Sequence, residues 1–201
     1  RWGILSTAKI AREHVIPAIL EADGAQLTAI GSRSIRKATE MAEHFGAPKS
    51  YGSYEELLSS KEIDAVYIPS PTSSHVEWSS KAAQMGKHVL CEKPLALKAQ
   101  DIDILIEIEK KNNVFISEAF MVAYHPQWQC VKELIQGGSI GSLRHVQGAF
   151  TYFNKDPNNM RNQLELGGGG LPDIGVYPIV TTRLATLEEP HAVTASIKYD
   201  K

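Results

Sequence analysis

The sequence has few cysteines, a balanced charge and no long apolar run, and each absence excludes a class of protein. Its two cysteines, Cys91 and Cys130, have neither CxxC nor metal-ligand spacing, which argues against a disulfide framework and a zinc site. The 21 basic and 23 acidic residues nearly cancel without forming blocks, so nucleic acid and anionic membranes are poor partners. No apolar stretch approaches the roughly 18 residues that a membrane span needs. We therefore expect a cytoplasmic protein with a small-molecule partner and no metal.

The chain of 201 residues is long enough for one complete α/β domain and part of another. It opens without a methionine and stops just after residues 192–199, which alternate like a strand and have no partner downstream. We expect a fragment or an incompletely represented chain.

The first part of the chain, residues 1–121, alternates short apolar runs with amphipathic stretches. This pattern is typical of βαβ units around a parallel sheet and predicts an α/β fold, a Rossmann dinucleotide-binding domain. Strands are expected over residues 2–5, 26–31, 64–68, 88–91 and 114–117. Helices are expected over residues 10–21, 35–45, 54–59, 75–85 and 99–111.

The second part, residues 122–201, follows a different pattern. Helices are expected over residues 126–136 and 173–186, and extended segments over 142–153 and 192–199. Two strands with one exposed face rarely stand alone. We therefore expect the beginning of an incomplete α+β domain.

The turn after the first strand, residues 6–11 (STAKIA), stands where dinucleotide-binding folds carry G-x-G-x-x-G/A. Small residues there let the backbone approach a pyrophosphate closely. Ser6 and Ala8 keep the small size but reduce the freedom to adopt positive φ. The candidate cofactor-binding residues are Ser6, Thr7, Ala8, Lys9 and Ile10. An ordinary strand-to-helix turn would explain the same pattern.

The end of the second strand carries basic residues where an NAD-preferring enzyme usually has an acidic one. Ser32 and Arg33, with Arg36 and Lys37 one helical turn away, suit the 2′-phosphate of NADP through charge-assisted hydrogen bonds. Arg33 is the strongest candidate, and NAD remains possible. A solvated basic helix start is the alternative.

Residues 86–96 (GKHVLCEKPLA) place a lysine directly after a central strand, at the edge where open α/β sheets bind ligands. An isolated lysine is usually a solvated surface charge. Together with residues 69–75 (PSPTSSH) and 167–177 (GGGGLPDIGVY), however, this block resembles the glucose-fructose oxidoreductase, inositol dehydrogenase and rhizopine-catabolism family (Gfo/Idh/MocA). The resemblance covers essentially the whole chain and is nearest to the dihydrodiol dehydrogenase and NADP-dependent aldose (xylose) dehydrogenase branch.

The resemblance implies that Lys93 lies beside the nicotinamide as acid/base and that the bond before Pro94 is cis. Such a group is needed because oxidising an alcohol removes hydride from carbon and a proton from oxygen. The remaining cofactor-binding candidates are Pro69, Pro71, Thr72, His75, Glu92 and Lys93 itself. His75 is expected to shape the cofactor loop, since the other histidines show no metal-ligand spacing around it.

The resemblance also implies that Asp173 holds substrate hydroxyl groups, and that Tyr177 takes a position that is commonly histidine. Their spacing of four residues places both on one helix face, and we count both as catalytic candidates. Asp173 could instead cap the helix beside Pro172. The further substrate-binding candidates are Tyr124, His125, Tyr152, Asn154 and Arg161. For His125, a helix-start residue packed near Trp128 is an equal alternative.

The predicted function is hydride transfer between NADP(H) and the CH–OH group of a sugar, polyol or trans-dihydrodiol. The alternative is a non-catalytic cofactor-binding homologue or sensor, which the changed glycines at Ser6 and Ala8 keep open. The resemblance further implies an open, mostly antiparallel sheet in the C-terminal domain and a possible homodimer through that sheet.

Overall fold

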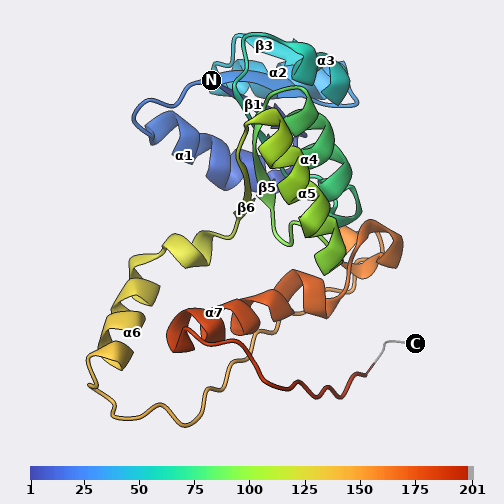
Figure 1. Ribbon diagram of the computed structural model, residues 1–201. Helices are drawn as coiled ribbons and strands as arrows, with labels where there is room; N and C mark the ends of the chain where they lie inside the picture. Colours follow the sequence, from blue (N-terminus) through green and yellow to red (C-terminus); the bar gives the residue numbers. More distant parts are fainter. Residues whose placement is uncertain (199–201) are drawn as a thin grey trace. The chain divides into compact units, whose positions relative to one another are not determined.

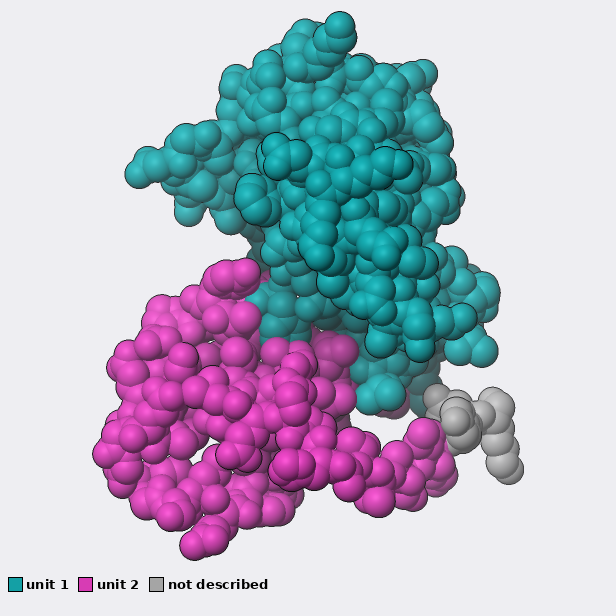
Figure 2. Space-filling model, in the orientation of Figure 1, with its two compact units in different colours: residues 1–120, 154–173 teal, residues 121–153, 174–201 magenta. Residues whose placement is uncertain are grey.

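A computed structural model describes residues 1–198, and the chain divides into two compact units (Figures 1 and 2). Unit 1 comprises residues 1–120 together with residues 154–173, and unit 2 comprises residues 121–153 and those from 174 onward. The segment 154–173 is thus grouped with the first 120 residues, although it comes later in the chain. The domain boundary at residue 121 stays a prediction.

Unit 1 contains a six-stranded parallel sheet in the order β3-β2-β1-β4-β5-β6. The strands are β1 (Trp2–Leu5), β2 (Leu27–Gly31), β3 (Lys49–Tyr51), β4 (Ala65–Ile68), β5 (His88–Glu92) and β6 (Ile116–Ala119). This parallel sheet confirms the predicted α/β class. The short strand β3 was not predicted, because its three residues, Lys-Ser-Tyr, show no apolar run.

The five predicted helices of unit 1 lie close to their predicted positions. They are α1 (Ile16–Glu21), preceded by the π-helical turn η1 (Ala11–Val15), α2 (Ile35–Phe45), α3 (Tyr54–Ser59), α4 (His75–Gln84) and α5 (Ala99–Asn112). Three short 3₁₀ turns, η2 (Thr72–Ser74), η4 (Met160–Asn162) and η5 (Leu164–Leu166), were not predicted. Two helix ends follow from local sequence. Gly46 ends α2 with a left-handed φ of 71°, and the Ser53 side chain accepts from the Glu56 amide at the start of α3.

The sheet is buried on both faces, since successive side chains of a strand point to opposite sides. Ile4 packs in one core with residues of η1, α1 and α2, whereas the adjacent Leu5 packs in a second core with residues of α3 and α4. Figure 1 shows α4 and α5 side by side. This two-sided cover explains why the strands read as continuous apolar runs.

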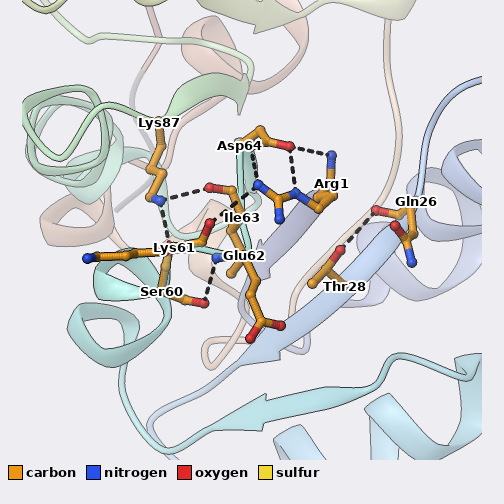
Figure 3. Close-up of polar contacts among 9 residues, drawn as sticks. All are labelled: Arg1, Gln26, Thr28, Ser60, Lys61, Glu62, Ile63, Asp64 and Lys87. Atoms are coloured by element: carbon orange, nitrogen blue, oxygen red, sulfur yellow. Dashed lines mark hydrogen bonds and ion pairs between the residues drawn. The ribbon is translucent and has the colours of Figure 1, made fainter.

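The amino ends of the strands are joined by polar contacts around the loop before β4 (Figure 3). Lys87 Nζ donates to the carbonyl groups of Ser60 (2.6 Å) and Ile63 (2.7 Å), and burial lowers the pKa of Lys87. The Arg1 guanidinium donates to the Asp64 carboxylate at 2.8 Å and 3.0 Å, which holds the pKa of Asp64 far below its usual value. These contacts fix the end of the sheet away from the candidate site.

Unit 2 is helical where it has regular structure. Its elements are η3 (Met121–Tyr124), α6 (Pro126–Gln136) and α7 (Val176–Thr186), and the turn η6 (Leu171–Gly175) bridges the two units in sequence. Within residues 121–198, the described part, no strand is present, so the predicted antiparallel sheet is not confirmed. Residues 142–153 and 192–198 form no ladder, and a strand exists only with a hydrogen-bonded neighbour. Tyr199, the end of the second predicted strand, lies outside the described residues.

No helix in residues 1–198 is long and apolar enough to cross a membrane.

Candidate active site

The loops after β1, β2, β4 and β5 leave the carboxyl edge of the sheet in unit 1. Strand β1 lies between β2 and β4, so the chain winds outward in opposite directions from β1. The loops after β1 and β4 therefore diverge at a topological switch point, where open α/β sheets bind ligands. The cofactor candidates of the first two loops and Lys93 all belong to this edge.

The turn after β1 reaches positive φ without a glycine. Ser6 has a φ of 135°, its amide donates to the Gly31 carbonyl at 2.9 Å, and its Oγ accepts from the Ala8 amide at 3.1 Å. The hydroxyl contact stabilises a conformation that serine rarely adopts. Lys9 forms an exposed ion pair with Glu13 at 3.8 Å. Ser6 therefore forms the tight turn, although a serine stands at the first glycine position of the G-x-G-x-x-G/A pattern.

The end of β2 combines a buried hydroxyl with exposed cations. Ser32 is buried and its Oγ accepts from the Ser34 amide at 3.2 Å, while Arg33 is exposed. Arg36 lies along α2 in an ion pair with Glu40 at 2.6 Å. A cavity of about 640 Å³ lies between the turn after β1, η1 and helix α2; it is lined by Thr7, Arg12, Glu13, Lys37, Glu40, Met41, His44 and Phe45.

The loop after β4 is tied to the loop after β5 by His75. The imidazole is 1% exposed, with Nδ1 lying 2.8 Å from the Pro94 carbonyl oxygen and Nε2 lying 2.8 Å from that of Ser70. The loop is itself buried at Pro69, Ser70 and Thr72. His75 thus shapes the candidate cofactor loop. Within residues 1–198, no group of three or more His, Cys, Asp or Glu side chains could hold a metal ion.

The Lys93 loop is held by side chains from two further strands. Tyr67 in β4 donates its hydroxyl to Glu92 Oε1 at 2.6 Å, and Glu118 Oε1 in β6 accepts from the Leu95 amide at 2.8 Å. Burial, and then the nearby Glu92 charge, raise the pKa of Tyr67. The Lys93–Pro94 bond is cis, as the resemblance implied. Together with His75 of α4, contacts from three elements therefore hold the loop that carries Lys93.

Sequence reasoning missed Tyr67 and Glu118. The available signals were weak: a hydroxyl in an otherwise apolar run, and a carboxylate at the end of a strand. A buried phenol requires a hydrogen-bond partner, but the sequence alone does not identify that partner.

Lys93 reaches Asp173, 80 residues later in the chain. Lys93 Nζ lies 3.0 Å from Asp173 Oδ1 and 2.5 Å from the Asp173 carbonyl oxygen, and both side chains are 13% exposed. Arg161 Nε donates to the other carboxylate oxygen, Oδ2, at 3.0 Å. Asp173 lies inside the η6 turn rather than before it, so helix capping does not describe its role. The structure brings together three of the predicted site residues.

Unit 2 contains four of the predicted site residues: Tyr124, His125, Tyr152 and Tyr177. His125 Nδ1 accepts from the Gln127 amide at 3.1 Å and caps α6, which agrees with the helix-start interpretation. The Tyr177 ring packs edge-to-face on Phe150, with centroids 5.0 Å apart. Tyr124 is exposed and Tyr152 is about half exposed. Their substrate roles stay predictions.

Asn154, in unit 1, turns its side chain back on its own loop, where Oδ1 accepts from the Asp156 amide at 3.0 Å. A substrate contact by Asn154 likewise stays a prediction.

Two protein-family models match this chain. Residues 1–120 match the model of an oxidoreductase family with an NAD-binding Rossmann fold, GFO_IDH_MocA, and residues 128–201 match the GFO/IDH/MocA C-terminal domain. The chain belongs to the GFO/IDH/MocA family.

Within the GFO/IDH/MocA family, the relatives are longer than this chain. An uncharacterized oxidoreductase of Rhizobium meliloti is 47% identical over 97% of the chain, which covers 58% of that protein. The D-xylose 1-dehydrogenase (NADP(+)) 2 of Haloferax volcanii is 36% identical over 98% of the chain and 61% of its own length. The crystal structure of KijD10, a 3-ketoreductase from Actinomadura kijaniata in complex with NADP and TDP-benzene, is similar with a TM-score of 0.88 and 36% identity, over 92% of this chain and 56% of that one.

The residues present at the carboxyl edge fit a dinucleotide. The helix after β1 begins at Lys9, directly after the tight turn, so its N-terminus lies at the position where dinucleotide-binding folds receive an anionic group. The Ser6 hydroxyl holds the Ala8 amide at this helix start. The tight turn at Ser6 and the cations beside β2 complete a site of suitable chemistry.

Proposed function

We propose that this chain is the cofactor-binding and proton-transferring part of an NADP-dependent oxidoreductase acting on the CH–OH group of a sugar, polyol or dihydrodiol. The observation that carries the proposal is the position of Lys93, on a loop held by contacts from three elements at the carboxyl edge and paired with Asp173. A flexible surface lysine would need none of these contacts.

Lys93 serves as the acid/base of the proposed reaction. When bound, NADP supplies the hydride acceptor or donor. In the oxidation direction Lys93 takes the proton of the substrate hydroxyl, and in the reduction direction it returns a proton to the same oxygen. Asp173 orients the Lys93 ammonium through its carboxylate and its carbonyl oxygen. Tyr177 is proposed to contact the substrate as well.

We assign the proposed preference for NADP over NAD to two residues that follow β2, Ser32 and Arg33. The Ser32 hydroxyl and the exposed Arg33 guanidinium can hold a 2′-phosphate through charge-assisted hydrogen bonds. Arg36 is paired with Glu40 and contributes charge rather than a direct contact in this proposal. The named relatives support the same preference, since the Haloferax enzyme is NADP-linked and KijD10 was crystallised with NADP.

The test is a screen of sugars, polyols and dihydrodiols with NADP and NAD, on the complete protein that carries this chain. Lys93→Ala is expected to lower turnover by about 10²–10⁴-fold at saturating cofactor and substrate, the usual contribution of a general acid/base. The exposed α5 residue Lys111 provides the control, Lys111→Ala, which should behave like wild type. Wild-type turnover in Lys93→Ala would refute the assignment.

A second arm addresses the cofactor. Arg33→Ala is expected to weaken NADP binding by about tenfold to a hundredfold, since hydrogen bonds to charged groups contribute about 1.5–3 kcal/mol, and to leave NAD binding unchanged. An unchanged preference would refute the phosphate assignment. Cofactor binding without turnover of any tested substrate would favour the non-catalytic homologue. A homodimer and a cytoplasmic location stay predictions.

A further inference from the structure

The Asp173 carboxylate is shared between two cations of unit 1. Lys93 contacts Oδ1 and Arg161 contacts Oδ2, each at 3.0 Å. Lys93 and Asp173 are mostly buried, whereas the Arg161 side chain is 46% exposed. While Arg161 occupies Oδ2, the carboxylate cannot turn both of its oxygens toward Lys93.

Backbone contacts hold Arg161 in this position. Its carbonyl oxygen accepts from the Gly169 amide at 2.9 Å, and its amide donates to Asn159 Oδ1 at 3.0 Å. The Asp173 amide in turn donates to the Gly169 carbonyl at 3.2 Å. Gly169 has a φ of 125°, a conformation that favours glycine. The glycine run therefore connects the backbone of Arg161 to the turn that carries Asp173.

We propose that Arg161 is a positioning residue that acts on Lys93 through Asp173 and keeps the amine ready to release its proton. The inference rests on the proposed function, in which Lys93 must lose a proton to act as base. Two positive charges compete for one negative charge, so Asp173 holds the Lys93 ammonium less strongly than it would alone. Without Arg161, both carboxylate oxygens could bind the ammonium and retain its proton.

The other titratable groups beside this loop are held by neighbours of their own: Glu92 by Tyr67, Glu118 by the Leu95 amide, and His75 at the carbonyl groups of Ser70 and Pro94. None of these contacts involves Arg161. We therefore expect these contacts to remain in place when Arg161 is changed.

A direct substrate contact by Arg161 makes a different kinetic prediction. Loss of a substrate contact raises KM, whereas loss of a positioning residue lowers kcat and moves the acidic limb of the pH profile. The two roles can therefore be separated by measuring both constants across pH.

The experiment compares Arg161→Gln, Arg161→Lys and Arg183→Gln in the complete protein. Arg183 pairs with Glu189 on the surface of unit 2 and is the matched control. Arg161→Gln is expected to move the acidic limb of kcat to higher pH by about half a unit to one unit, which lowers kcat about three- to tenfold on that limb. Arg161→Lys, which keeps the charge, should restore the wild-type limb. A raised KM with an unmoved limb would overturn the proposal.

A second measurement does not depend on turnover. Acetic anhydride labels uncharged amines, and peptide mass spectrometry can follow the labelling of Lys93 against pH. In Arg161→Gln, the pH at which half of Lys93 is labelled should rise by about half a pH unit to one pH unit, as for the acidic limb. In Arg183→Gln, this midpoint should stay unchanged. An unmoved midpoint overturns the role of Arg161, even if no substrate is found. A moved midpoint without any turnover would instead count against the proposed enzyme.

Discussion

Gly168→Ala tests how closely the glycine run is packed in unit 1. A Cβ at residue 168 would lie 2.5 Å from the Met160 carbonyl oxygen, 2.6 Å from the Arg161 carbonyl oxygen and 2.8 Å from the Arg161 carbonyl carbon. All three atoms belong to the backbone, which would have to move by roughly half an ångström to one ångström to reach ordinary contact. Such overpacking costs about 1–3 kcal/mol. The Gly169–Arg161 hydrogen bond should weaken as well.

Gly170→Ala is the matched control in the same run, since a Cβ there meets no atom within 4 Å. It should be neutral or should stabilise the protein by up to about 1 kcal/mol, because alanine restricts the unfolded chain. Urea unfolding of the complete protein measures the difference, and hydrogen exchange of residues 154–173 locates it. Equal unfolding midpoints and equal exchange in the two variants would refute the packing argument.

Three further predictions concern the rest of unit 1 and the cysteines. Burial raises the pKa of the Cys91 thiol to about 12, whereas Cys130 is exposed, so a thiol reagent should label only Cys130 until the protein is denatured; labelling of both in the native state would contradict the burial. Tyr67→Phe removes the hydrogen bond to the Glu92 carboxylate and should cost about 1.5–3 kcal/mol in urea unfolding; an unchanged midpoint would show that the bond adds nothing. The pKa of Asp64 is lowered in the fold, so its ion pair stabilises the protein only while the carboxylate is ionised. Asp64→Asn should therefore destabilise at pH 7, by less than about 1 kcal/mol for this exposed pair, and the difference should begin to shrink as the pH falls below about 4, the ordinary pKa of an aspartate; a difference that stays constant as the pH falls would count against it.

The regular elements of unit 1 could be predicted because local sequence determines them. Helix α2 ends at a glycine that adopts left-handed φ, and α3 begins after a capping serine. Strand β3 could not be predicted, because three polar or amphipathic residues become a strand only by pairing with β2. In unit 2, helix α6 was predicted at its observed bounds, since Pro126 begins it and Gly137 follows it.

The candidate site was predictable in its residue types but only partly in its contacts. The resemblance pointed to Lys93 and Asp173, and the structure places their side chains in contact. The pairing of Arg161 with Asp173 depends on a turn whose path is set by backbone hydrogen bonds between the two segments. No periodicity or motif encodes such a path, so Arg161 was expected to contact substrate instead.

The grouping of residues 154–173 with the first 120 residues matters for anyone who recombines this protein with a relative. A chimera joined at residue 120 would keep the lysine loop but would take Asp173 and Arg161 from the donor of the second part. Those two residues make their ion pairs within unit 1, so the foreign segment would have to fit the loops of its new host. Exchanges that retain residues 154–173 with their original neighbours should leave the charge arrangement around Lys93 intact and allow the remaining residues to vary.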